Sequence, residues 1–171
     1  MINNESANYN TIGKNDECYT PAYGVTPLLE YIKPNDIVWC PFDDENSEFV
    51  KIFKKNNIKV IYSHIKYGQD FFKYEPKEKW TILISNPPFT RKKEIFERAL
   101  SFNKPFALLM TASCLNDSAP VKLFLNRNLE ILHFTKRMKF KNCGNTIPFK
   151  AIYYCSDFLP KGNIMKELKI K

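Results

Sequence analysis

The segment KWTILISNPPF, residues 79–89, carries the clearest structural signal in the sequence. Its first part is a β-branched, apolar run that predicts a buried central strand, and Asn86 and two prolines follow at once. Proline has no backbone N–H to donate to a sheet, so Pro87 must end the strand. Both prolines hold φ at about −65° and restrict the residue before them. The sequence therefore predicts a stiff, extended turn that presents Asn86 and Phe89 in a fixed geometry.

On both sides of this strand, short apolar runs alternate with helical patterns of roughly ten residues. Strands or short extended elements are expected at residues 36–42, 58–65, 68–72, 79–86, 104–112, 129–137 and 147–158. Helices are expected at residues 26–33, 45–57, 91–102 and 120–128, with Thr26 as an N-cap. This order predicts an α/β fold with a doubly wound, mostly parallel sheet and helices on both faces. The last two strands lack a helix between them and should form an antiparallel hairpin at one edge.

The chain has 171 residues, of which 44% are hydrophobic and 15% aromatic, enough for the core of one domain. We expect a flexible polar tail at residues 1–16, a single domain at 17–160, and a basic, weakly helical tail at 161–171. No apolar stretch reaches the roughly 18–20 residues of a membrane span. The N-terminus also lacks the apolar region of a secretory signal, so a cytoplasmic location is expected.

Cysteine and histidine are sparse and scattered. The five cysteines are odd in number, widely spaced and without a C-x-x-C motif, which speaks against a disulfide framework or a zinc site and favours reduced thiols. The two histidines, His64 and His133, are isolated, so a structural role is expected for each and no metal site is predicted.

In a doubly wound sheet, ligands bind at the carboxyl ends of the strands. Three segments fall there, at residues 40–44, 68–72 and 86–89. In the third, the Asn86 side-chain oxygen and the Pro87 carbonyl can accept the two protons of an exocyclic –NH2 group. The ring of Phe89 offers a face on which a base can stack. Prolines would preorganise these acceptors, which is a usual source of catalytic gain.

On these residues the sequence resembles the class I S-adenosylmethionine-dependent methyltransferases that act on amino groups, and most of all the adenine-N6 DNA methyltransferases. The resemblance spans about residues 19–156 and implies Asn86, Pro87, Pro88 and Phe89 as the catalytic motif. It also implies cofactor contacts by a Thr-Pro segment, by the loop after the first strand and by an Asp-Phe segment. These contacts are Thr20, Pro21, Cys40, Pro41, Phe42, Asp43, Asp70 and Phe71. A late strand resembles the one whose aromatic residue, here Phe149, stacks on an extruded base.

The sequence departs from that pattern around the cofactor. The loop that contains glycines in the family has Asp43, Asp44 and Glu45 here. The acidic residue that usually ends the first strand in the family is replaced by Cys40. Ser63 and His64 replace the carboxylate that binds the ribose hydroxyls. Carboxylates near the cofactor's own carboxylate should repel it, so weak binding of S-adenosylmethionine is expected.

The net charge of +8 favours a polyanionic partner. Seven basic residues are expected on the rim of the site, where they would contact nucleic acid: Arg91, Lys92, Lys93, Lys136, Arg137, Lys139 and Lys141. The alternative is a solvated basic hairpin. DNA is favoured over RNA, and a protein partner could supply target recognition because the chain has no room for a large recognition domain.

Two functions follow. The first is methyl transfer from S-adenosylmethionine to an exocyclic amino group, with N6 of adenine in DNA as the leading target. Related motifs also serve guanine N2, adenine in RNA and glutamine, and the Thr-Pro segment favours DNA adenine. The second is an inactive methyltransferase fold that binds nucleic acid or protein. Plain structural roles stay open for the Asn-Pro-Pro-Phe turn, for Asp70 as a solvated acid and for Phe149 as a core aromatic.

Overall fold

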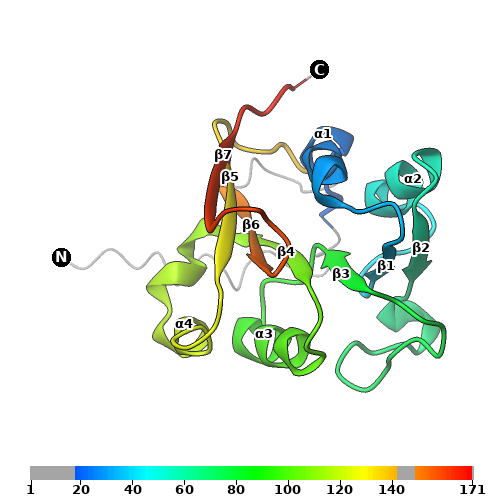
Figure 1. The fold of residues 1–171 in the computed structure, drawn as a ribbon, viewed down its shortest axis with the longest axis horizontal. Helices are drawn as coiled ribbons and strands as arrows, with labels where there is room; N and C mark the ends of the chain where they lie inside the picture. Colours follow the sequence, from blue (N-terminus) through cyan, green and yellow to red (C-terminus); the bar gives the residue numbers. More distant parts are fainter. Residues whose placement is uncertain (1–17, 142–148, 171) are drawn as a thin grey trace.

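The computed structural model describes residues 18–141 and 149–170, which form one seven-stranded sheet with helices on both faces (Figure 1). The strands are β1 (Ile37–Cys40), β2 (Lys59–Tyr62), β3 (Ile82–Ser85), β4 (Phe106–Thr111), β5 (Glu130–Phe134), β6 (Ala151–Ser156) and β7 (Asn163–Lys166). The α-helices are α1 (Ala22–Val25), α2 (Glu48–Lys55), α3 (Lys92–Ser101) and α4 (Ser118–Lys122). Three 3-10 helices are η2 (Thr26–Tyr31), η3 (Ile65–Tyr67) and η4 (Ala112–Asn116).

The strand order is β2-β1-β3-β4-β6-β5-β7. All paired strands run parallel except β6, which is antiparallel to both β4 and β5. The predicted doubly wound, mostly parallel sheet is therefore confirmed, and so is the antiparallel pairing of the two late strands. Their place at the edge is wrong, because β6 lies inside the sheet and β7 forms the edge beyond β5.

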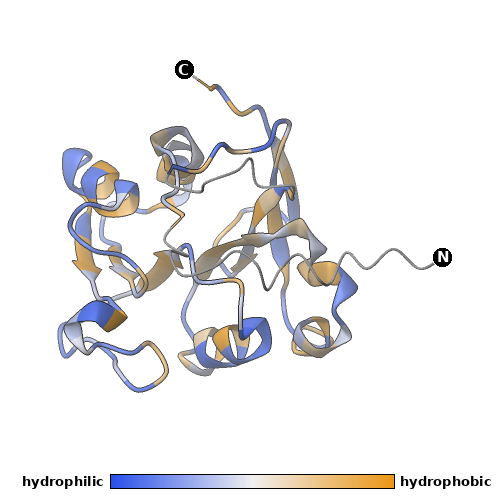
Figure 2. Ribbon diagram, turned by 180° about the vertical axis from the view of Figure 1, so that it is seen from behind, coloured by the Kyte–Doolittle hydropathy of each residue, from blue (hydrophilic) through white to orange (hydrophobic). Residues whose placement is uncertain are grey.

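Two apolar layers hold the helices against the sheet. One contains Val25, Leu28, Phe49 and Phe53 from α1, η2 and α2, and the other contains the buried residues of α3. Strands and the inward helix faces carry the hydrophobic residues, while the outer helix faces are hydrophilic (Figure 2). Strands β3, β4 and β6 are buried along their whole length, as expected for central strands with both faces covered.

Several boundaries differ from the sequence-based prediction. The first helix begins at Ala22, and Thr26 is not its N-cap, because the Thr26 hydroxyl donates to the Ala22 carbonyl at 2.9 Å. Residues 68–72 form no strand, since Gly68 adopts a φ of 76° and ends η3. The helix expected at 120–128 is shorter, spanning Ser118–Lys122.

The segment expected as a weakly helical tail contains β7 instead. Its residues alternate between exposed and half-buried, and Ile164 packs against the core. Leu168, just beyond the strand, is fully buried. The helical expectation is wrong because this period-two pattern suits a strand beside β5. The polar segment expected at residues 1–16 lies outside the described residues. None of the described helices has the length and apolar character needed to cross a membrane.

Candidate functional site

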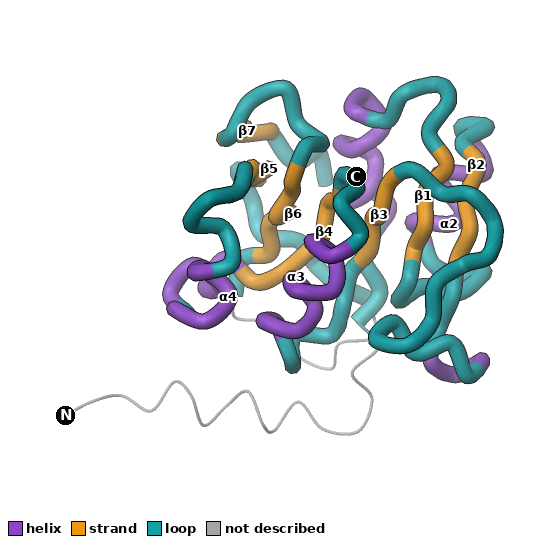
Figure 3. Tube along the Cα trace, turned by 60° about the horizontal axis from the view of Figure 1, so that its bottom comes forward, coloured by secondary structure: helices purple, strands orange, loops and turns teal. Residues whose placement is uncertain are grey.

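The candidate site lies where the parallel strands β1, β2 and β3 end. Cys40 pairs with Tyr62 at the last position of β1 and β2, and β3 lies on the other side of β1. Figure 3 shows β4, β3, β1 and β2 in succession across the sheet, with loops joining strands to helices. Because the three strands run in the same direction, the residues that follow them gather at one rim.

Asn86 follows β3 directly and has a defined side-chain orientation. Its Nδ2 donates a hydrogen bond to the Cys18 carbonyl at 3.2 Å. Its Oδ1 is buried and has no hydrogen-bond partner among the described residues. Buried polar atoms are rarely left without partners, so this oxygen is a vacant acceptor. Among the described residues, no hydrogen bond to the Pro87 carbonyl is found either.

Thr20 has a second vacant polar atom. Its Oγ1 is buried and unpartnered among the described residues, and Pro21 beside it is also buried. The segment is held in place by the Tyr19–Lys141 bridge, whose two backbone hydrogen bonds measure 3.1 and 3.0 Å. Residues 18–21 thus reach the turn at Asn86 on one side and Lys141 on the other.

Phe89 and Phe149 meet at the rim. Their ring centroids are 5.1 Å apart with an interplanar angle of 84°, an edge-to-face contact. Both rings are half-buried, so part of each stays accessible to a ligand. The structure brings together the two aromatic residues that the sequence assigned to base stacking. The first residues of the strand expected at 147–158 lie outside the described residues, and the strand itself begins at Ala151.

The glycine-free loop after β1 turns its first acid inward. Asp43 is 7% exposed, and its Oδ1 accepts a hydrogen bond from the Ser47 hydroxyl at 2.5 Å. Its other oxygen accepts a hydrogen bond from the Ser85 hydroxyl. Burial raises the pKa of Asp43 to about 6, although both serine hydroxyls favour the charged form and the nearby Asp44 disfavours it.

The other two acids of the loop also have partners. Asp44 is paired with Lys66 and accepts a hydrogen bond from the Asn46 N–H at 2.8 Å. Burial alone would raise its pKa, but Lys66 and that N–H lower it overall. Glu45 accepts a hydrogen bond from the Tyr67 hydroxyl at 2.7 Å. The expected repulsion of a cofactor by three free carboxylates therefore loses its basis.

Ser47, Ser85 and Lys66 were not predicted as part of the site. Ser47 carried a usable signal, since serine before an amphipathic run predicts an N-cap, and its hydroxyl does accept from the Phe49 N–H at 3.2 Å. Ser85 and Lys66 had no such signal, because only the fold brings them to Asp43 and Asp44.

The other predicted cofactor residues are mostly buried. Phe71 is 2% exposed and packs against Trp39 and Phe42, with the Phe42 ring 4.7 Å away, so it belongs to the core rather than to the rim. Asp70 caps its own turn by accepting from the Phe72 N–H at 3.0 Å. Cys40 is fully buried, and burial raises the pKa of its thiol well above the usual value.

After β2 the side chains are Ser63 and His64 rather than a carboxylate. The Ser63 hydroxyl accepts from the Trp39 indole N–H at 3.0 Å, and His64 Nδ1 accepts from the Lys66 backbone N–H at 3.2 Å.

The cysteines differ in their state. The thiols of Cys40, Cys114 and Cys155 are free, as expected, and they are buried. Cys18 is disulfide-bonded, which corrects the expectation that all cysteines are reduced thiols. The described residues include no cluster that could hold a metal ion.

The predicted basic rim falls into two groups. Four of its members contact other side chains: Arg91 stacks on Phe72 at 3.8 Å, Lys92 pairs with Asp117, Lys93 with Glu97, and Lys141 with Glu48. The remaining three, Lys136, Arg137 and Lys139, are exposed and form no ion pair with a described residue. Their charges are the most available to a polyanion.

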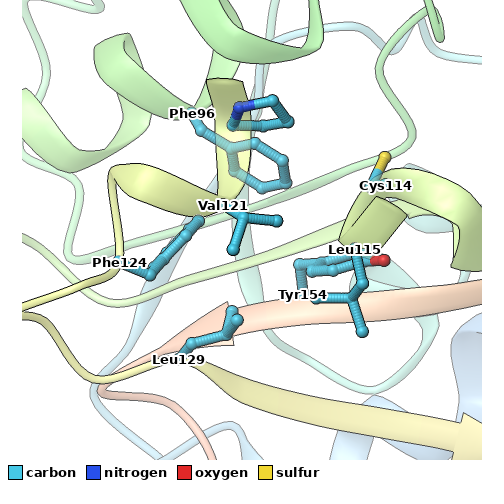
Figure 4. A pocket seen from close by; sticks show the side chains of 8 residues that line it. Phe96, Cys114, Leu115, Val121, Phe124, Leu129 and Tyr154 are labelled. Atoms are coloured by element: carbon cyan, nitrogen blue, oxygen red, sulfur yellow. The ribbon is translucent and has the colours of Figure 1, made fainter. Parts of the chain in front are cut away.

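A small apolar pocket lies elsewhere, between α3, η4, α4 and β6 (Figure 4). Its lining residues are Phe96, Cys114, Leu115, Pro120, Val121, Phe124, Leu129 and Tyr154. None of them belongs to the predicted site. The Tyr154 hydroxyl is engaged with the Thr111 and Ala112 carbonyls at 3.2 and 3.1 Å, so the pocket has no free polar group from that residue.

Comparison with known proteins places this geometry in a fold. No family model and no curated protein matches the chain. A candidate class I S-adenosylmethionine-dependent methyltransferase from Listeria monocytogenes superposes with a TM-score of 0.55 at 13% identity, over 94% of this chain and 68% of its own. A predicted O-methyltransferase from Agrobacterium tumefaciens covers 85% of this chain and 84% of its own at 12% identity, with a TM-score of 0.41. A possible methylase from Clostridium difficile 630 covers 80% and 36% at 14% identity, with a TM-score of 0.35.

At these identities the likeness concerns the fold alone. The chain has the Rossmann-like fold of class I S-adenosylmethionine-dependent methyltransferases. The buried Thr20 Oγ1 has no partner among the described residues, so it would be available to the methionine end of that cofactor. The chain fits the ribose less well, because Ser63 and His64 offer no carboxylate after β2.

Proposed function

We propose that the chain transfers a methyl group from S-adenosylmethionine to an exocyclic amino group, with N6 of adenine in DNA as the favoured acceptor. The single observation that carries this proposal is the state of Asn86. Its Nδ2 is fixed on the Cys18 carbonyl, which leaves the buried Oδ1 as a vacant acceptor at the end of β3. An exocyclic amino group has two N–H donors, one for this oxygen and one for the Pro87 carbonyl.

The chemistry follows from those acceptors. Hydrogen bonds from both amino protons to Asn86 and Pro87 would localise the nitrogen lone pair and direct it. A preorganised acceptor costs no reorganisation during the reaction, which is why such groups are worth several kcal/mol in transition-state stabilisation. The cofactor, when bound, supplies a methyl group that is already activated, so this chain needs no titrating base to start the reaction.

A planar, aromatic acceptor is supported by Phe89 and Phe149. Their edge-to-face contact leaves part of each ring accessible at the same rim. Stacking of a base on an aromatic side chain is worth about 1–3 kcal/mol and requires the base to leave its duplex or to start from a single strand. Nucleic acid is further favoured by the exposed cations at residues 136, 137 and 139, which form no ion pair with any described residue.

A second candidate is a methyltransferase fold that binds nucleic acid or protein without catalysis. The observation that favours it is the lack of a carboxylate after β2, where Ser63 and His64 stand. This alternative keeps the basic surface and predicts no methyl transfer.

The deciding experiment incubates purified protein with isotopically labelled S-adenosylmethionine and adenine-containing DNA, single-stranded and duplex, and identifies methylated nucleosides by mass spectrometry. We expect label in N6-methyladenine. Label in guanine, in RNA only or in a glutamine-containing peptide would keep methyl transfer but replace the acceptor. Binding of DNA without any labelled product would favour the second candidate.

A further inference from the structure

The loop after β1 has lost the glycines of the family it resembles, yet a buried network fixes its course. The Asp43 N–H donates to the Ser63 carbonyl at 3.2 Å, at the end of β2. The Asp43 carboxylate accepts from Ser47 at the start of α2 and from Ser85 at the end of β3. One residue therefore connects the ends of three strands and the first turn of a helix.

Ser85 is the link to the candidate site. Its hydroxyl donates to Asp43 and accepts from the Phe42 N–H at 3.3 Å. The next residue in the chain is Asn86, whose vacant Oδ1 carries the proposed function. Any change in the bond between Asp43 and Ser85 must therefore act on the backbone that presents Asn86.

A carboxylate does here what a neutral amide cannot. It only accepts hydrogen bonds, so it directs both serine hydroxyls toward itself and leaves the Ser85 lone pairs for Phe42. An asparagine in its place would turn one donor toward a serine and reverse that bond. Burial raises the pKa of Asp43 and so disfavours its charged form. A neutral side chain would be sufficient if the residue had only to form a structural hydrogen bond.

We propose that Asp43 is a positioning residue: its carboxylate ties the glycine-free loop to Ser85 and thereby sets the place of Asn86. This inference rests on the proposed function for its catalytic meaning, but its structural content is independent of it. Protonation of Asp43 removes the purely accepting carboxylate, so the environment of Asn86 changes with pH over the range in which Asp43 titrates.

Other ionisable groups surround this carboxylate. Asp44, in the same loop, raises the pKa of Asp43 and is itself held by Lys66. Burial raises the pKa of the Cys40 thiol on β1 and of the Tyr153 hydroxyl on β6 well above their usual values, and the Asp43 charge raises both further. Both therefore stay neutral near pH 6, the range in which Asp43 changes its charge.

The test follows the side-chain amide resonance of Asn86 by NMR between pH 4.5 and 8. In the wild type we expect it to shift with a midpoint near pH 6. In Asp43→Asn the shift should vanish. The matched control is Asp44→Asn, the same change in the same loop without contact to Ser85. It should keep the shift and lower its midpoint, because the Asp44 charge raises the pKa of Asp43.

Ser85→Ala covers the case in which Asp43→Asn does not fold. It retains the carboxylate and removes the link, so the Asn86 shift should fall to less than half. An Asn86 resonance that does not move in the wild type, or that moves equally in Asp43→Asn, overturns the inference. Methyl-transfer rates over the same pH range separate the two proposals. If the resonance behaves as stated but no variant transfers a methyl group, the proposed function fails and the positioning role of Asp43 stands.

Discussion

The rings of Phe89 and Phe149 meet edge to face, with centroids 5.1 Å apart, although one follows β3 and the other precedes β6. These strands are separated by β4 in the sheet. The contact therefore closes the rim across a neighbouring strand and places two aromatic surfaces near Asn86.

The first prediction concerns this pair. Phe149→Ala should lower kcat/KM for adenine methylation about 10- to 100-fold, because a lost stacking surface costs about 1–3 kcal/mol. Phe149→Tyr retains the ring and should stay within about threefold of the wild type. Steady-state assays with single-stranded DNA measure both variants. A Phe149→Ala enzyme as efficient as Phe149→Tyr would leave Phe149 only a packing role.

The second prediction uses the buried carboxylate. The pKa of Asp43 is about 6 in the folded protein and about 3.8 in the unfolded chain, so between these values the folded state holds a proton that the unfolded state has released. The stabilisation that this group contributes to the folded state is therefore fully present below pH 3.8. It is lost as the pH rises through 6, and the total loss is about 3 kcal/mol. Asp43→Asn lacks this loss.

The measurement is urea unfolding of wild type and Asp43→Asn at several pH values. The free energy of unfolding of the variant, minus that of the wild type, should rise by about 2–3 kcal/mol between pH 4 and pH 7. Subtraction removes the titration of groups that both proteins share. Two parallel stability curves would show that Asp43 titrates in the folded protein as it does in the unfolded chain.

The sequence predicted the sheet well because its signals are local. The apolar runs before Cys40, Asn86 and Thr111 predict buried strands, and Pro87 marks an end that no tertiary contact can move. The carboxyl-end rule then predicts the candidate site at the ends of these strands. The β7 strand was missed because it is only four residues long, two of them polar, and only the neighbouring β5 gives it a partner.

The site was less predictable than the fold, because its hydrogen bonds join distant segments. The sequence predicts that Asp43 and Asp44 repel the cofactor, since nothing in it places Ser85 or Lys66 beside them. The resemblance to an Asp-Phe segment implies that Phe71 contacts the cofactor, yet its ring packs against Trp39 and Phe42. The base-stacking role of Phe149 stays a prediction, but the structure places its ring against Phe89, a contact that the sequence alone did not predict.

The third prediction concerns the basic rim. Lys136, Arg137 and Lys139 are exposed without an ion pair to a described residue. Replacing all three by alanine should flatten the log–log salt dependence of duplex DNA binding by roughly two to three units, since each phosphate contact contributes about 0.9. Fluorescence anisotropy over a salt series measures the slope.

The control for this rim is a triple alanine variant of Lys55, Lys77 and Lys79, which are exposed. These residues precede β2 and β3, so they lie near the amino ends of those strands, away from the candidate site at the carboxyl ends. It removes the same charge and should leave the slope nearly unchanged. Equal effects of the two triple variants would mean that only the net charge of the protein matters.

The fourth prediction concerns the cofactor. Calorimetry should give weak binding of S-adenosylmethionine, with a Kd near 1 mM, or about −4 kcal/mol. The reason is the missing carboxylate after β2, rather than repulsion by the inward-facing and paired acids of the loop. Thr20→Val, which removes the vacant hydroxyl at nearly constant size, should weaken binding further. A Kd of micromolar or tighter would show that other groups replace the ribose carboxylate.

The central claim is that Asn86 holds the amino group that receives the methyl. Single-turnover methyl transfer to adenine-containing DNA by the wild type and by Asn86→Ala tests it most directly, with circular dichroism to verify that both are folded. The loss of one preorganised acceptor should slow the chemical step about 10²- to 10³-fold. Equal rates for the two proteins would contradict the role assigned to Asn86.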